Sequence, residues 1–321
     1  MKIRVEKGSL LAAIQDNGRY GTRAAGTSPG GALDMVSLHL ANLLVQNRPE
    51  EGTLEIGGSG LSLSVPAGLT LALTGAHRQV LLDGKALPFY RPVYIRRKGT
   101  LLFGKALRGR VTYLAVAGGY SLPLSCPGRT FAEGDEYAIG RIIPSQAAFV
   151  GRMERCAEPD DSFVTVPWSI DGDFVFPDGP VRVVESHAES AVPESSRATF
   201  FRSSYLLSSR SDRRLYPLEG IKLEPGKGSL LAPVPLRFGS IQVRENGDPV
   251  IFMPDGDTVG CGSLIGQVIL ADLPRVAQCR PGEMLTFQPI YQTQAEECLA
   301  RQQAYVKQLK AKIEEALQRR V

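Results

Sequence analysis

Residues 61–73 of the chain read Leu-Ser-Leu-Ser-Val-Pro-Ala-Gly-Leu-Thr-Leu-Ala-Leu. Apolar and polar side chains alternate from Leu61 to Val65, which is the period of a β-strand with one buried face. The Pro-Ala-Gly of residues 66–68 is a turn signal, and a second apolar run begins directly after it at Leu69. This stretch therefore predicts two short strands joined by a tight turn.

Similar strands recur along the sequence, with turn signals such as Asp83-Gly84 and Asn246-Gly247 between them. Further strands are predicted at residues 2–5, 79–82, 93–96, 100–103, 112–116, 181–184, 240–244, 250–253, 268–271 and 284–288. The 34 glycines and 22 prolines are spread along the chain, as expected for many turns. The pattern predicts β-barrels or sandwiches rather than a doubly wound α/β sheet.

Two segments have helical periodicity instead. Residues 33–45 contain neither Gly nor Pro and place Val36, Leu40 and Leu44 on one face. Residues 293–296 read Thr-Gln-Ala-Glu, which fits a capping box, and apolar residues follow at helical spacing at 299, 306, 309, 313 and 317. This tail predicts a long amphipathic helix that either docks on its own subunit or mediates contacts in a homo-oligomer. Between the two helices, residues 154–180 are rich in Asp, Pro and Gly and predict an excursion or linker.

The composition narrows the class of protein. The chain has 37 Lys and Arg against 33 Asp and Glu, a net charge of +4, which does not call for nucleic acid or a membrane as partner. The N-terminus lacks the apolar segment of a signal peptide, and the five cysteines, Cys126 among them, form no CxxC. We therefore expect a cytoplasmic protein with reduced thiols. The three histidines share no metal-ligand spacing, so no metal site is expected, and there is no GxxxxGK(S/T) or GxSxG motif.

A longer series of residues resembles one known family. Residues 14–21 read Ile-Gln-Asp-Asn-Gly-Arg-Tyr-Gly, residues 31–34 read Gly-Ala-Leu-Asp, and residues 40–47 read Leu-Ala-Asn-Leu-Leu-Val-Gln-Asn. Later pieces follow in the family's order at residues 54–56, 72–76, 113–119, 128–130, 211–213, 218–220, 239–243, 247–250 and 280–283. Together they resemble the family of KipA, the C subunit of 5-oxoprolinase and allophanate hydrolase subunit 2, over most of the chain.

The resemblance implies a mainly β fold of β-barrel domains, the C-terminal one cyclophilin-like, with a few helices. On this basis we expect an N-terminal β-rich domain at residues 1–105, a barrel domain at residues 106–292 and a C-terminal helix at residues 293–321. The resemblance also implies partners: a smaller subunit of the KipI or allophanate hydrolase subunit 1 kind, and a third subunit in 5-oxoprolinase.

Three functions are consistent with the resemblance. The first is a subunit of a 5-oxoprolinase-type complex, an ATP-dependent amide-ring hydrolase that acts on a small-molecule amide and binds ATP in the assembled complex. The second is a non-catalytic regulatory or binding subunit that partners a KipI-like protein. The third is a biotin-dependent carboxyltransferase like the corresponding domain of urea amidolyase.

One segment departs from the family's pattern. The family usually shows D-x-Q-T-x-G-G-Y-P-K-I, whereas residues 255–265 here read Asp-Gly-Asp-Thr-Val-Gly-Cys-Gly-Ser-Leu-Ile. Leu264 thus stands where the family has a lysine that, in the carboxyltransferase relatives, resembles a contact for biotin or the transferred carboxylate. Leucine offers neither a charge nor a donor to a developing anion. Biotin is therefore not expected, and the chain is either an active hydrolase subunit or a catalytically degenerate one.

The remaining polar residues of the matched segments are the candidate site. Asp34, Arg19 and Asp212 are the candidate catalytic residues, since a carboxylate beside a guanidinium can orient a carboxylate or ureido substrate. Asp34 also lies at the start of the predicted helix, where an aspartate caps a helix. The candidate substrate-binding residues are Asn17, Arg213, Asp257 and Thr258. An ion pair inside the protein is the alternative for Asp212 and Arg213.

Overall fold

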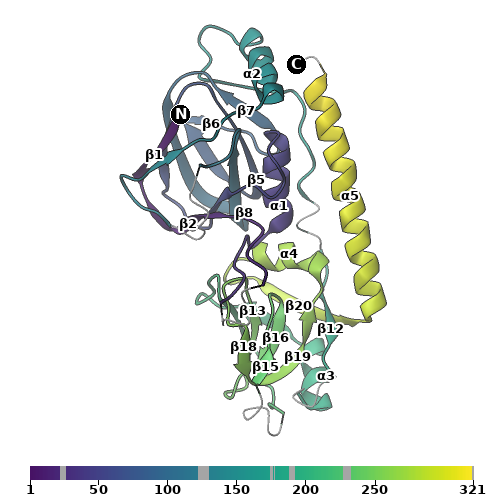
Figure 1. The fold of residues 1–321 in the computed structure, drawn as a ribbon. Coiled ribbons are helices and arrows are strands. Elements are labelled where there is room, and N and C mark those ends of the chain that lie inside the picture. Colours follow the sequence, from purple (N-terminus) through teal and green to yellow (C-terminus); the bar gives the residue numbers. More distant parts are fainter. Residues whose placement is uncertain are drawn as a thin grey trace. The chain divides into compact units, whose positions relative to one another are not determined.

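The computed structural model describes residues 1–21, 27–121, 130–173, 176, 178–187, 192–226 and 233–319 (Figure 1). The chain divides into two compact units. The first unit comprises residues 1–17, 34–175 and 305–321, and the second comprises residues 18–33 and 176–304. Cys126 and residues 128 and 129 of the matched segment 128–130 lie outside the described residues. The expected mainly β fold with barrels and a long C-terminal helix is confirmed.

The first unit is built on an 11-stranded sheet. Its strands are β1 (Lys2–Lys7), β2 (Ser9–Gln15), β3 (Thr53–Ile56), β4 (Ser62–Val65), β5 (Leu69–Leu82), β6 (Lys85–Ala86), β7 (Pro92–Ile95), β8 (Gly99–Val116), β9 (Thr130–Phe131), β10 (Glu136–Ala138) and β11 (Phe163–Thr165). The main path runs β10-β1-β4-β8-β3-β2-β9, and β5 pairs with β6, β7 and β8. Leu63 and Val65 of β4 are fully buried while Ser62 and Ser64 are not, so the alternation of the opening stretch is confirmed.

Two strands of this sheet are longer than the sequence pattern predicts. The expected strands at residues 69–73 and 79–82 are parts of β5, and those at residues 100–103 and 112–116 are parts of β8. Register shifts between Gly75 and Val80 let β5 and β8 stay paired along their length, as β-bulges do. The expected domain boundary after residue 105 falls inside β8. The linker expected at residues 154–180 contains β11, which pairs with β7.

Two complete helices belong to the first unit. Helix α1 (Met35–Leu44) is the predicted helix, and it packs on β5 and β8. Helix α2 (Pro144–Arg155) was not predicted. It begins with Pro144, a favourable first residue, and the Ile143 N–H donates to the Gln146 side chain at 2.9 Å. Only Phe149 and Met153 among its apolar residues are buried, too few for a clear helical stripe in the sequence.

The second unit holds a closed barrel in the order β12-β19-β16-β17-β14-β13-β20. Its strands are β12 (Val181–Glu185), β13 (Ser204–Leu207), β14 (Leu215–Glu219), β16 (Ser240–Val243), β17 (Pro249–Phe252), β19 (Ser263–Val268) and β20 (Met284–Ile290). Strands β15 (Pro233–Pro235) and β18 (Val259–Cys261) form a separate pair, and helix α3 (Glu194–Arg202) contacts β20.

The prediction of a strand at residues 268–271 is wrong. Strand β19 ends at Val268, and the chain continues as a 3₁₀ turn, η3 (Leu270–Asp272), and helix α4 (Leu273–Gln278). The buried Asp272 carboxylate accepts hydrogen bonds from the Arg182 backbone N–H at 2.8 Å and from its Nε at 3.0 Å. These bonds hold the turn, and Pro274 favours the start of a helix over a strand.

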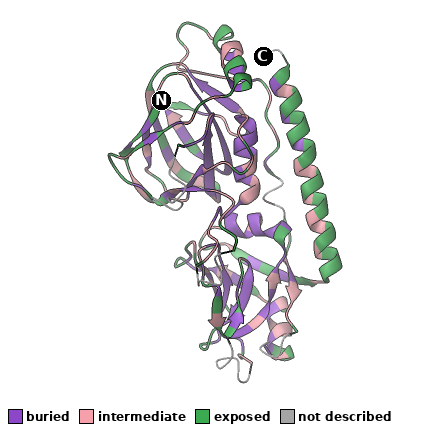
Figure 2. Cartoon of the chain, in the orientation of Figure 1, coloured by how far each residue is buried: buried purple, intermediate pink, exposed green. Residues whose placement is uncertain are grey.

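The C-terminal tail is the predicted long helix, α5 (Gln292–Gln318). Its first turn is capped two residues earlier than predicted, because the Tyr291 N–H donates to the Gln294 side chain at 3.0 Å. Leu309, Ile313 and Leu317 are buried and most of the remaining surface of α5 is exposed (Figure 2). These three apolar positions are therefore covered by the chain's own residues. Among the described residues, no helix is long and apolar enough to cross a bilayer.

Candidate functional site

The second unit contains a loop formed by the matched segment after residue 17. The Arg19 N–H donates to the Pro29 carbonyl at 2.7 Å, which brings the two ends of this loop together. Gly18 has φ +79°, and a Cβ there would lie 2.8 Å from the Gly30 carbonyl oxygen. Only glycine fits this turn, so the Asn17-Gly18-Arg19 sequence sets the position of Pro29 and Gly30.

Arg213 connects this loop to the barrel. Its Nε lies 2.7 Å from Asp255 Oδ2 and its Nη2 lies 3.1 Å from Asp255 Oδ1, a bidentate pair. The same Nη2 donates to the Gly31 carbonyl at 2.6 Å. Arg213 therefore links Gly31 to Asp255, which follows β17.

The two neighbours of Arg213 in the chain, Asp212 and Arg214, each form polar contacts of their own. Asp212 Oδ1 accepts from the backbone N–H groups of Arg214 at 2.7 Å and Leu215 at 2.9 Å, which is an Asx turn leading into β14. Arg214 Nη2 lies 3.1 Å from Asp257 Oδ1. The structure thus pairs Arg213 and Arg214 with the two aspartates of the altered segment, and it gives Asp212 a turn-forming role.

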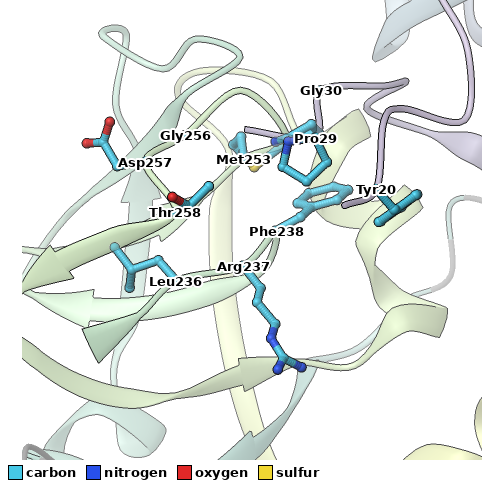
Figure 3. Close-up of a pocket in the computed structure, with 11 residues that line it drawn as sticks. Tyr20, Pro29, Gly30, Leu236, Arg237, Phe238, Met253, Gly256, Asp257 and Thr258 are labelled. Carbon is cyan, nitrogen blue, oxygen red and sulfur yellow. The ribbon is translucent and has the colours of Figure 1, made fainter. Parts of the chain in front are cut away.

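A small pocket opens beside these residues, entirely within the second unit (Figure 3). It is lined by residues from three segments: Tyr20, Pro29, Gly30, Leu236, Arg237, Phe238, Met253, Pro254, Gly256, Asp257 and Thr258. Its volume is about 40 Å³, and one water needs roughly 10–15 Å³ measured in this way. The pocket therefore accepts one end of a small molecule, and the rest of that molecule would lie outside it.

The walls of this pocket combine apolar side chains with polar groups. Met253 and Leu236 are buried, and the buried Thr258 brings a hydroxyl into the lining. The Arg237 side chain runs away from Pro29 and Met253, and the Asp257 carboxylate also points away from them (Figure 3). A hydroxyl in the lining and an arginine beside it are groups that can bind a polar small molecule.

Asp34, in the first unit, forms the N-cap of α1. It is fully buried, and its two carboxylate oxygens accept from the Ser37 N–H at 2.9 Å and the Ser37 hydroxyl at 2.6 Å. Its own N–H donates to the Tyr113 hydroxyl at 2.8 Å, which donates to Glu55 at 2.7 Å. Burial and the nearby Glu55 carboxylate raise the pKa of Tyr113 well above its ordinary value, so this network keeps the phenol neutral. The geometry supports the capping alternative, and a catalytic role for Asp34 stays a prediction.

Asn17 also lies in the first unit, against α1. Its Oδ1 is 2.8 Å from His39 Nε2, which places the proton of the imidazole on that nitrogen if the ring is neutral. Burial lowers the pKa of His39, and the Glu50 carboxylate acts in the opposite direction without outweighing it. Asn17 thus orients a neutral histidine, while Arg19 is an exposed residue of the second unit.

The predicted site residues are therefore divided between the two units. Asp257 and Thr258 line the pocket, Arg213 braces it, and Arg19 closes the loop that supplies Pro29. The sequence did not single out Tyr20 or Arg237. Tyr20 lies within the matched segment of residues 14–21, which could have indicated it, whereas nothing in the sequence around Arg237 distinguishes it from other exposed arginines.

Leu264, where the resemblance implies a lysine in other members, faces an apolar cluster of the barrel. It packs on the cluster of Val234, Leu236, Val250 and Phe252, and it pairs across β16 and β19 with Gln242. Gln242 is buried, and its Nε2 has no hydrogen-bond partner among the described residues. The altered segment therefore contributes apolar packing at this position and no charge.

The comparisons with known proteins agree with this architecture. A family model described as carboxyltransferase domain, subdomain A and B, matches residues 25–289. The chain belongs to this family. It is 29% identical to the 5-oxoprolinase C subunit of Haemophilus influenzae over 310 residues, which cover 95% of this chain and 96% of that protein. It is also 29% identical to the 5-oxoprolinase C subunit of Escherichia coli over 321 residues, with 96% and 97% covered.

Solved structures of longer proteins share the fold. Urea amidolyase of K. lactis matches 99% of this chain with a TM-score of 0.77 at 21% identity, and the match covers 20% of that protein. The protein TTHA0988 matches 89% of this chain with a TM-score of 0.72 at 23% identity. This chain spans little more than half, 56%, of TTHA0988. At these identities the likeness concerns the fold alone.

Proposed function

We propose that this chain is a subunit of a 5-oxoprolinase-type complex, which opens a small cyclic amide in an ATP-dependent reaction. The observation that carries the proposal is the end-to-end match with two proteins named as the C subunit of 5-oxoprolinase, over 95–96% of this chain and 96–97% of theirs. The longer urea amidolyases match only over a small part of their length, 20% in the K. lactis structure.

The pocket of the second unit supports this proposal. A volume of about 40 Å³ suits one edge of a small ring rather than a polymer or a large cofactor. A subunit with so small a pocket needs further surfaces to enclose a substrate, which fits an assembly with a KipI-like subunit and a third subunit. ATP is proposed as a co-substrate of that assembly.

A second candidate, a non-catalytic binding subunit, is favoured by one observation. Leu264 packs in an apolar cluster at the position where the family's lysine stands, so the chain lacks that ammonium group. The same observation places biotin-dependent carboxyl transfer third, because leucine cannot stabilise a carboxylate or its developing charge.

Reconstitution distinguishes these candidates. The full chain is purified with a KipI-like subunit and a third subunit, and glutamate release from 5-oxoproline is measured with ATP present. The proposal expects glutamate only when this chain is included, and an inactive complete complex would contradict it. If the partner co-purifies, the complex is inactive and Leu264→Lys restores nothing, the second candidate, a non-catalytic binding protein, stands instead.

A further inference from the structure

We propose that the pocket of the second unit binds the amide edge of a small carboxylate-bearing molecule, with Thr258 hydrogen-bonding the amide and Arg237 pairing with the carboxylate. The choice of such a ligand rests on the proposed function. The assignment of the two residues rests on the pocket itself, and four features carry it.

The first feature is the balance of charge around the pocket. Asp255 is paired with Arg213, with a shortest distance of 2.7 Å, and Asp257 is paired with Arg214 at 3.1 Å. Among the described residues, Arg237 has no ion-pair or hydrogen-bond partner for its guanidinium. The lining and its bracing residues therefore carry one uncompensated positive charge, and this charge selects an anion.

The second feature is how firmly the backbone under Arg237 is held. The Arg237 N–H donates to Ser240 Oγ at 2.9 Å, and the Leu236 N–H donates to the Thr258 carbonyl at 2.8 Å. The Phe238 carbonyl accepts from Gln267 Nε2 at 2.7 Å. The backbone on both sides of Arg237 is thus fixed, while its side chain extends freely from that base.

The third feature is the hydroxyl of Thr258. The residue is only 9% exposed and lines the pocket, and its side chain makes no hydrogen bond to any described residue. A ligand carbonyl or N–H that enters here therefore meets a hydroxyl that no described residue engages, and it gains a hydrogen bond there.

The fourth feature is the size and polarity of the space. Its small volume and its mixture of apolar side chains and polar groups suit the uncharged amide edge of a ring better than a solvated carboxylate. The Arg237 guanidinium ends away from these walls, where a carboxylate outside the pocket can meet its planar fork (Figure 3). Both groups suit the ligand that the proposed function supplies, a small cyclic amide with one carboxylate beside the ring.

Binding to the full chain tests this inference, with 5-oxoproline compared against its uncharged carboxamide by titration calorimetry. The wild type should bind 5-oxoproline more tightly, and salt should weaken that binding but not the binding of the carboxamide. Arg237→Gln should weaken the binding of 5-oxoproline by about tenfold and remove the preference for 5-oxoproline over its carboxamide. The affinity of Arg237→Lys for 5-oxoproline should lie between those of the wild type and Arg237→Gln. Thr258→Val should weaken both ligands by about fivefold.

Arg244→Gln is the matched control, because Arg244 is an exposed arginine of the same barrel outside the pocket. It should leave both affinities unchanged. The inference is overturned if 5-oxoproline does not bind, if it binds no better than its carboxamide, or if Arg237→Gln and Arg244→Gln behave alike. If binding depends on Arg237 but the complete complex shows no turnover, the inference stands and the proposed function is rejected. If the complex turns over 5-oxoproline and Arg237→Gln leaves KM unchanged, the proposed function stands and the inference is rejected.

Discussion

Arg213 holds both carboxylate oxygens of Asp255, at 2.7 and 3.1 Å, and with the same guanidinium binds the carbonyl of Gly31. One side chain thus joins two of the three segments that line the pocket, the loop with Pro29 and Gly30 and the segment with Asp257 and Thr258. Charge-assisted bidentate bonds of this kind are stronger and more directional than neutral ones.

Replacing Arg213 should therefore affect the pocket more than the fold. Arg213→Met should lower the free energy of unfolding by about 1–2 kcal/mol, because the pair is partly exposed, and should weaken 5-oxoproline binding. Arg213→Lys should recover part of the stability but less of the binding, since an ammonium cannot reproduce the fork. Urea unfolding and calorimetry give the two quantities, and unaltered binding in Arg213→Met would contradict the bracing role.

Asp34 offers a test that separates capping from catalysis. Asp34→Ala should lower the free energy of unfolding by about 1–2 kcal/mol, because it removes the N-cap and leaves the Ser37 N–H and hydroxyl without their acceptor. Asp34→Asn retains an acceptor for the Ser37 N–H and should lose less. If Asp34→Asn unfolds like the wild type but its complex releases no glutamate, the carboxylate acts in the chemistry and the purely structural interpretation fails.

His39 should make stability depend on pH in one direction. Burial lowers its pKa in the folded protein, so the unfolded chain binds the proton more readily below the ordinary pKa of about 6.5. The histidine's contribution is present above that pH and is lost as the pH falls towards the folded-state pKa. The free energy of unfolding in urea should fall between pH 7 and pH 5, and it should fall more for the wild type than for His39→Gln. Parallel pH profiles for the two proteins would argue against this assignment.

Gln242 and Gln267 form a matched pair of glutamines in the barrel. The buried Gln242 Nε2 has no partner among the described residues, whereas Gln267 bonds to the Phe238 carbonyl and to Ser240. Gln242→Met should raise the free energy of unfolding by about 1 kcal/mol, since it removes an unsatisfied donor at similar volume. Gln267→Met should lower it by a similar amount. Destabilisation by Gln242→Met equal to that by Gln267→Met would show that the Gln242 amide is satisfied in solution.

Short-range patterns predicted much of the fold. The alternation from Leu61 to Val65 and the apolar face of residues 33–45 both gave the observed elements, because burial of one face determines each period. Helix α2 and the turn at residues 270–272 were missed, since Pro144 and the Arg182–Asp272 bonds determine them and neither leaves a periodic signal.

The site residues were harder to predict from the sequence than the fold. Asp257 and Thr258 could be named from the altered signature, but the pocket brings together residues more than 200 positions apart in the chain, from Tyr20 to Thr258. Arg237 owes its role to the pairing of Asp255 and Asp257 with Arg213 and Arg214, and no local motif encodes that pairing. Such a charge balance appears only when the barrel has closed.

The most direct test of the central claim is the initial rate of glutamate release from 5-oxoproline by the complete complex, with ATP and with either the wild-type chain or Arg237→Gln. The account predicts ATP-dependent release that requires this chain, and a KM for 5-oxoproline that rises by about tenfold in Arg237→Gln while kcat changes much less. A complete complex with the wild-type chain that releases no glutamate would contradict it.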